Sequence, residues 1–109
     1  MTRIVIRKDH SGAYRQLSCF GHAGFADHGK DVVCASISVL VINTINALEQ
    51  LAGEAFETVV NEEDGFIRCD FTGSLQERSI FLLDALVFGL QNIQKEYGKK
   101  YLQVKFEEV

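Results

Sequence analysis

His22 and Cys34 are the residues of this chain whose types and spacing best suit chemistry. They bracket a glycine-containing loop, twelve positions apart, that leads into a long apolar segment with a helical pattern. An imidazole can take a proton from a thiol and later return it to a leaving amine. The resulting thiolate attacks carbonyl carbons. The pair therefore predicts covalent catalysis by a cysteine if the fold brings the two side chains together.

The expected position of Cys34 favours a thiolate. If Asp31 is the N-cap of the helix, Cys34 lies in the first turn, where backbone N–H groups lack intrahelical partners and the helix dipole is positive. The N–H groups around Val33 and Cys34 are also candidate donors to an oxyanion. The Asp31 carboxylate would oppose a thiolate in part. Ser38, one turn further on the same face, could orient a ring nitrogen or bond the backbone carbonyl of residue 34.

Roles outside catalysis stay open for these residues at this point. A cysteine in an apolar helix is commonly a small buried side chain, and a histidine beside a strand end is commonly solvated or satisfied within the core. His22, His28 and Cys34 could instead bind zinc, although their spacing matches no familiar ligand pattern. Cys19 and Cys69 lie in predicted strands, away from any helix terminus, and are expected to pack in the core.

Composition limits the class of protein. The chain has 109 residues, of which 47% are apolar, which predicts one domain over residues 1–109. The net charge is −4 and no basic run exceeds Lys99-Lys100, which argues against nucleic-acid binding. We expect no signal peptide and no membrane span, since the longest uninterrupted apolar stretch is Val39 to Ile42. Three cysteines without a C-x-x-C pair favour a reduced cytoplasm over a disulfide scaffold.

Hydrophobic periodicity and turn signals predict the order ββαββαβ. The expected strands cover 3–8, 13–21, 56–61, 66–71 and 101–106, and the expected helices cover 32–52 and 75–97. Asp31 and Gly53 delimit the first helix, and Ser74 with Glu77 forms a capping box for the second. The first helix is apolar nearly all round, so we expect it to be covered on more than one side. Amphipathic strands favour an α+β fold of two layers, a mainly antiparallel sheet with two helices on one face.

The motif around the two candidate residues resembles the signature of the bacterial ribosomal-processing cysteine protease family Prp. The resemblance rests on Gly21-His22-Ala23, Gly29, Asp31-Val32-Val33-Cys34-Ala35 and Ser38. Chain length and the order of strands and helices agree over essentially the whole sequence. Ser36 departs from the pattern, which leads us to expect a smaller apolar residue or glycine, and this affects the shape of the pocket more than the chemistry.

The resemblance implies a protease with a Cys–His dyad, in which Cys34 is the nucleophile, His22 the general base, and Asp31 and Ser38 supporting residues. It implies no cofactor and no metal. The family removes an N-terminal extension from the precursor of large-subunit ribosomal protein number twenty-seven. It cleaves at a short Phe-rich motif and forms homodimers.

The resemblance also implies that the loop between the catalytic residues, here 23–33, moves to admit substrate. Gly24 and Gly29 suit such mobility. Phe25 lies between small residues in this loop and is the better candidate for substrate contact, whereas Phe20, in a strand, is expected to pack in the core.

Two other functions remain as alternatives. The chain could be a non-enzymatic adaptor that binds a ribosomal protein or an assembly partner through the same loop. A thiol-dependent redox or acyl-transfer enzyme is the third hypothesis, and it lacks a resolving cysteine at short spacing.

Overall fold

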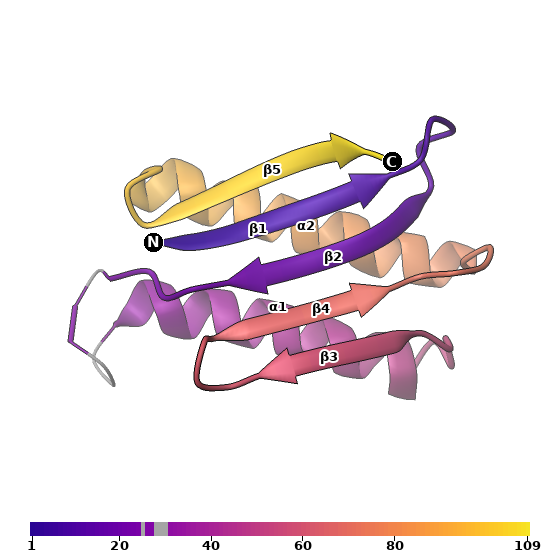
Figure 1. Cartoon of the computed structure of the whole chain (residues 1–109), viewed down its shortest axis with the longest axis horizontal. Coiled ribbons are helices and arrows are strands. Elements are labelled where there is room, and N and C mark those ends of the chain that lie inside the picture. Colours follow the sequence, from indigo (N-terminus) through magenta and orange to yellow (C-terminus); the bar gives the residue numbers. More distant parts are fainter. Residues whose placement is uncertain (25, 28–30) are drawn as a thin grey trace.

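The computed structural model describes residues 1–24, 26–27 and 31–109. Phe25 and Gly29 of the predicted substrate-binding loop, and His28 of the zinc alternative, therefore lie outside the described residues. The elements follow the predicted order ββαββαβ (Figure 1). They are β1 (Thr2–Lys8), β2 (Tyr14–Phe20), α1 (Val32–Gln50), β3 (Glu57–Asn61), β4 (Phe66–Asp70), α2 (Glu77–Tyr97) and β5 (Leu102–Glu108).

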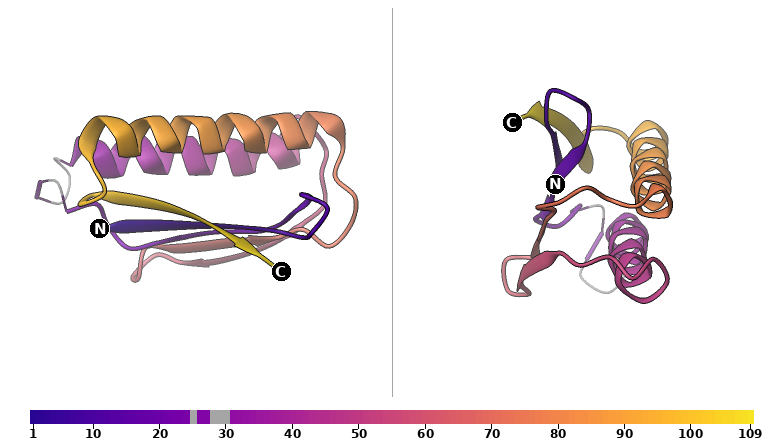
Figure 2. Two further views of the ribbon diagram at one scale, coloured as in Figure 1. Left: turned by 90° about the horizontal axis from the view of Figure 1, so that it is seen from above. Right: turned by 90° about the vertical axis from the view of Figure 1, so that its right-hand side faces the viewer.

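The five strands form one sheet in the order β3-β4-β2-β1-β5. β1 runs parallel to β5, and the other neighbouring strands are antiparallel. Both helices cover the same face of the sheet (Figure 2), which confirms the predicted two-layer α+β fold. The pairing of β2 with β4, with Cys19 opposite Ile67, places the β3–β4 hairpin beside the end of β2.

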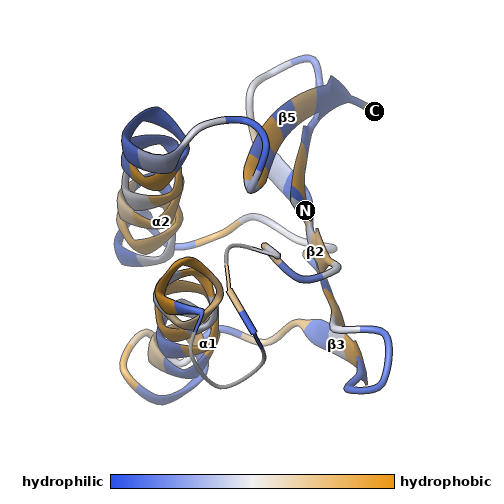
Figure 3. Cartoon of the chain, turned by 90° about the vertical axis from the view of Figure 1, so that its left-hand side faces the viewer, coloured by the Kyte–Doolittle hydropathy of each residue, from blue (hydrophilic) through white to orange (hydrophobic). Residues whose placement is uncertain are grey.

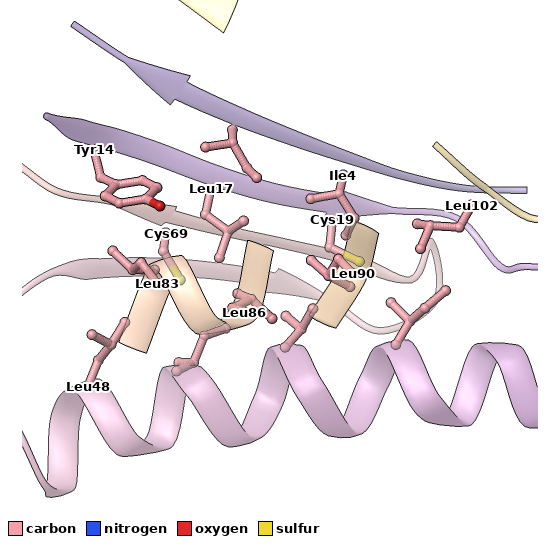
Figure 4. Close-up of a cluster of buried hydrophobic side chains, with 14 of the residues drawn as sticks. Ile4, Tyr14, Leu17, Cys19, Leu48, Cys69, Leu83, Leu86, Leu90 and Leu102 are labelled. Carbon is pink, nitrogen blue, oxygen red and sulfur yellow. The ribbon is translucent and has the colours of Figure 1, made fainter. Parts of the chain in front are cut away.

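The core fills the space between the sheet and the two helices (Figure 4). Alternation along β1 buries Ile4 and Ile6 completely, as the strand pattern predicts. Cys19 and Cys69 are also buried among apolar side chains, so their predicted packing role is confirmed. The helices contribute residues at helical spacing, among them Val33, Ile37, Val41, Leu48, Leu83, Leu86 and Leu90.

The first helix begins at its predicted cap. Asp31 has extended backbone angles, and its side chain accepts a hydrogen bond from the Cys34 backbone N–H. At the other end, Gly53 has the positive φ of +65° that favours glycine, just beyond the last helical turn. The predicted helix boundaries are therefore correct to within two residues at the C-terminal end.

Most residues of α1 are apolar (Figure 3), and the helix packs against both the sheet and α2. Val39 and Leu51 are nevertheless 65% and 75% exposed. By length and composition alone, α1 is long and apolar enough to cross a membrane, because this criterion tolerates polar residues between apolar ones. The expectation from sequence rested on uninterrupted apolar residues only, and the absence of a membrane span stays a prediction. The core helix of a soluble protein meets the same criterion, so the finding is weak evidence for a membrane span.

The predicted capping box of the second helix is wrong. α2 begins at Glu77, and its N-cap is Gln76, whose side chain makes no capping bond. A residue distant in sequence supplies the cap instead. Glu54 Oε1 accepts hydrogen bonds from the Gln76 backbone N–H at 3.0 Å and from the Ser79 hydroxyl at 2.8 Å. The segment between α1 and β3 thereby fixes the start of α2, and a local sequence pattern does not reveal this.

Replacing Glu54 by Ala should lower the free energy of unfolding by about 1 kcal/mol, because the fully buried Ser79 hydroxyl loses its acceptor. The bonds from the Gln76 N–H and the Ser79 hydroxyl lower the pKa of Glu54 below its ordinary 4.5. Its contribution is therefore present above pH 4.5 and is lost as the pH falls through the lowered pKa. Urea titrations of the wild type and the variant at neutral and acidic pH measure this difference. Equal stabilities at pH 7 would contradict the assignment.

Candidate active site

The structure brings the two candidate residues together at one end of the molecule. Sγ of Cys34 lies 3.9 Å from Nδ1 of His22. The Cys34 side chain is partly exposed and the His22 side chain is exposed, so both can be reached from solvent. Hydrogen bonds of a catalytic pair are often long in a site without substrate and shorten when the substrate binds. The pair can therefore exchange a proton after a small movement of either side chain.

Asp31 and the start of α1 position Cys34. The Asp31 carboxylate accepts the Cys34 N–H at 2.9 Å, and the Ala35 N–H bonds to the Asp31 carbonyl at 3.0 Å, which begins the helical ladder. Cys34 therefore occupies the third helical position, as predicted. The Cys34 N–H already donates to the Asp31 carboxylate. It can therefore donate to an oxyanion only if this capping bond breaks.

Gly21 positions His22 at the end of β2. Its φ is +90°, and a β-carbon added there would lie 2.7 Å from the carbonyl oxygen of Met1. Only glycine fits at this point, because other residues would clash with the backbone of the neighbouring strand and strain their own. Gly21 thus lets the chain leave the sheet beside β1 and turn His22 towards the start of α1.

Two adjoining cavities share His22, Cys34 and Ser38 in their walls. The first has a volume of about 260 Å³ and lies between α1 and the β3–β4 hairpin. Its walls are mostly apolar, with Ile37, Val41, Ile42, Val60, Phe66 and Ile67 among the lining residues. The second lies beside the described part of the loop and is lined also by Gly24, Ala26, Asp31 and Ala35. An extended chain that crosses the Cys34–His22 pair would therefore find room on both sides.

The prediction that Phe20 packs in the core is wrong. Phe20 is 51% exposed, because alternation along β2 points Leu17 and Cys19 inward and the next residue outward. Its ring contacts the Phe66 ring edge-on, with 6.3 Å between the centroids. This contact joins the end of β2 to the start of β4, directly beside the site.

The supporting residues lie where a role in the site is feasible. Asp31 borders the second cavity, and Ser38 borders both. Gly24 has a positive φ of +71°, consistent with a glycine-dependent turn. The wall formed by β3 and β4, including Val60 and Gly65, was not foreseen from the sequence. The Asp-Gly turn signal marks this hairpin, but only the long-range pairing of β4 with β2 brings it to the site.

Comparison with known proteins identifies the family. The family model described as cysteine protease Prp matches residues 1–103. The chain belongs to the Prp family. The ribosomal processing cysteine protease Prp of Bacillus subtilis (strain 168) is 31% identical over 103 residues, which cover 89% of this chain and 90% of that protein. The chain is accordingly a cysteine protease, which favours the enzymatic hypothesis over the adaptor.

Solved structures agree with the fold. The crystal structure of the Staphylococcus aureus Prp protease with a covalently linked product peptide superposes with a TM-score of 0.92 at 21% identity, covering 98% of this chain and 100% of that one. SMU.848 from Streptococcus mutans has a TM-score of 0.86 at 27% identity, covering all of this chain and 96% of that one. The Prp fold thus extends over 98% of the sequence.

Iodoacetamide should label Cys34 selectively in the folded protein. Burial raises the pKa of Cys19 to about 11, with a smaller contribution from nearby Cys34, and burial also raises the pKa of Cys69. Both of these thiols are protonated at neutral pH and shielded from the reagent. Peptide mass mapping after brief labelling at pH 6, with glutathione as reference, measures the three rates. Labelling of Cys34 no faster than glutathione would contradict an activated thiol.

Proposed function

We propose that this protein removes the N-terminal extension of the precursor of large-subunit ribosomal protein number twenty-seven, using Cys34 as nucleophile and His22 as general base. The observation that carries the dyad is the 3.9 Å separation of Sγ and Nδ1 at the N-terminus of α1, next to an apolar cavity. The relatives named ribosomal processing cysteine proteases support a ribosomal substrate.

In the proposed reaction His22 accepts and returns a proton twice, and the Cys34 sulfur first attacks and later leaves. His22 takes the thiol proton, and the Cys34 thiolate attacks the carbonyl carbon to form a tetrahedral oxyanion. The protonated imidazole then gives its proton to the leaving amine, and the C–N bond breaks to leave an acyl-enzyme. His22 next takes a proton from water, whose oxygen attacks the thioester carbonyl, and the acid product leaves as the thiol re-forms. Positive partial charge at the start of α1 favours the thiolate throughout.

The first cavity suits an aromatic side chain of the substrate. Its volume of about 260 Å³ exceeds the roughly 150 Å³ of an apolar cavity known to hold benzene. Its apolar walls lie directly beside Cys34. We therefore assign this cavity to a Phe side chain close to the scissile bond, in agreement with the Phe-rich motif implied by the family.

We place this activity in the cytoplasm. All three cysteines are free thiols in the structure, which suits a reducing compartment. A catalytic thiol also needs reducing conditions in order to remain available for attack.

We further propose that the protein is a homodimer. Val39 on α1, Leu51 at the C-cap of α1, and Phe81 and Phe88 on α2 are each between 65% and 75% exposed. Phe81 and Phe88 are two helical turns apart and so lie on the same side of α2. Burial of such side chains between two copies would remove apolar surface from water. Light scattering across a range of concentrations measures the mass, and a monomer at all concentrations would contradict the proposal.

Cys34→Ala should fold like the wild type and lose cleavage by a factor of about 10⁴ or more. Cys34→Ser should be nearly as inactive, since a hydroxyl is far harder to deprotonate than a thiol. Incubation with the organism's own precursor, followed by mass analysis of the products, measures both. Cleavage by purified Cys34→Ala would refute the assignment of Cys34 as nucleophile. If the wild type cleaves a Phe-containing peptide but not the precursor, only the proposed substrate is refuted.

Val60→Glu should raise KM for a Phe-containing peptide by at least about tenfold, because it places a charge in the wall of the apolar cavity. Val59 provides a matched control on the same strand. It pairs with Arg68 on the opposite face of the sheet, whereas Val60 pairs with the cavity residue Ile67. Val59→Glu should therefore leave KM near the wild-type value. Equal effects of the two substitutions on KM would show that the cavity does not bind the substrate.

A further inference from the structure

The turn between β3 and β4 lies close enough to the His22 ring that a side chain at Gly65 would meet it. A β-carbon added to Gly65 would lie 3.1 Å from Cε1 and 3.2 Å from Nε2 of His22. It would also lie 3.2 Å from the carbonyl oxygen of Gly21. These separations are tighter than ordinary carbon contacts, so a larger residue at position 65 would have to displace the ring, the end of β2 or the turn itself.

The two sides of the His22 ring therefore have different neighbours. Nδ1 faces the Cys34 sulfur at 3.9 Å, while the Cε1–Nε2 edge faces the position that a β-carbon of residue 65 would occupy. A side chain at position 65 would crowd this edge of the ring and displace it from its present place. The absence of a side chain at position 65 thus leaves room for the ring beside Sγ.

The turn itself is well fixed. The Asn61 side-chain amide donates to Asp64 at 3.1 Å, and the Asn61 side-chain oxygen accepts the Asp64 N–H at 3.3 Å. The Gly65 N–H bonds to the Glu62 carbonyl at 3.2 Å. The Phe20–Phe66 ring contact then ties the first residue after the turn to the end of β2. Gly65 is consequently held in place beside His22.

We propose that Gly65 is a positioning residue for the His22 imidazole, and that its lack of a side chain leaves the room that the ring needs to lie beside the Cys34 sulfur. The proposal rests on the proposed role of His22 as general base. Gly65 acts through His22 and does not touch the reacting atoms. Its positive φ of +62° also favours glycine, so a test must separate backbone strain from crowding of the ring.

Gly53 is a matched control for this separation. Its φ is +65°, close to that of Gly65, and a β-carbon added there would meet no atom within 4 Å. Gly65→Ala and Gly53→Ala therefore introduce similar backbone strain, whereas only Gly65→Ala crowds His22. Asn tolerates a left-handed backbone better than Ala, so Gly65→Asn and Gly53→Asn form a second pair with less strain.

The experiment measures kcat and KM for a Phe-containing peptide, the alkylation rate of Cys34 and the melting temperature in all four variants. We expect kcat to fall about tenfold in both position-65 variants, since a misplacement of about 1 Å can cost about 10²-fold. Gly65 also borders the first cavity, so KM should rise as well. Cys34 alkylation involves no substrate, and its slowing in parallel with kcat is the result that reports on His22. The position-53 variants should retain wild-type kcat and alkylation, with melting temperatures lowered as much as those of their position-65 counterparts.

Wild-type kcat and alkylation in Gly65→Asn would overturn the proposal. So would equal losses of kcat in the two members of a pair, because backbone strain alone would then explain them. If Gly65→Ala does not fold, the Asn pair decides alone. His22→Asn distinguishes this proposal from the proposed function. An inactive His22→Asn with a fully active Gly65→Asn refutes only the role of Gly65, whereas an active His22→Asn refutes the dyad.

Discussion

The approach of the Cys34 sulfur to Nδ1 of His22 is the interaction on which the proposed chemistry of this protein depends. Neither side chain is catalytic alone at neutral pH, since a thiol is a poor nucleophile and an imidazole needs a proton donor within reach. Their separation of 3.9 Å requires the end of β2 and the start of α1 to meet at the same end of the molecule. Gly21 directs the chain at the end of β2, and Asp31 caps the start of α1.

The rest of the fold keeps these two ends in place. The core between the sheet and the helices is apolar, and each fully buried Leu contributes about 1.5–3 kcal/mol relative to an exposed one. The sheet order brings the β3–β4 hairpin beside β2, where it forms one wall of the first cavity. Two of the three thiols are buried in this core, which leaves Cys34 as the accessible one. Cys19 and Cys69 thus serve packing, whereas Cys34 is available for chemistry.

Local patterns predicted the parts of the structure that local physics determines. The Asp31 cap, the element order and the burial of Ile4 and Ile6 follow from neighbours within one or two turns of the chain. The capping box at Ser74 fails because Glu54, more than twenty residues away in sequence, supplies the cap by tertiary contact.

The site divides in the same way between local and long-range features. Cys34 and His22 are found from residue type and spacing, whereas Val60 and Gly65 reach the site only through the pairing of β4 with β2. The outward direction of Phe20 follows from the local alternation of Leu17 and Cys19 along β2.

The rate of Cys34 alkylation by iodoacetamide at neutral pH, compared between wild type and His22→Asn, tests the central pair without reference to any substrate. Alkylation several-fold slower in the variant is the expected result, since the imidazole no longer accepts the thiol proton. Equal rates in a correctly folded variant would show that His22 does not activate Cys34.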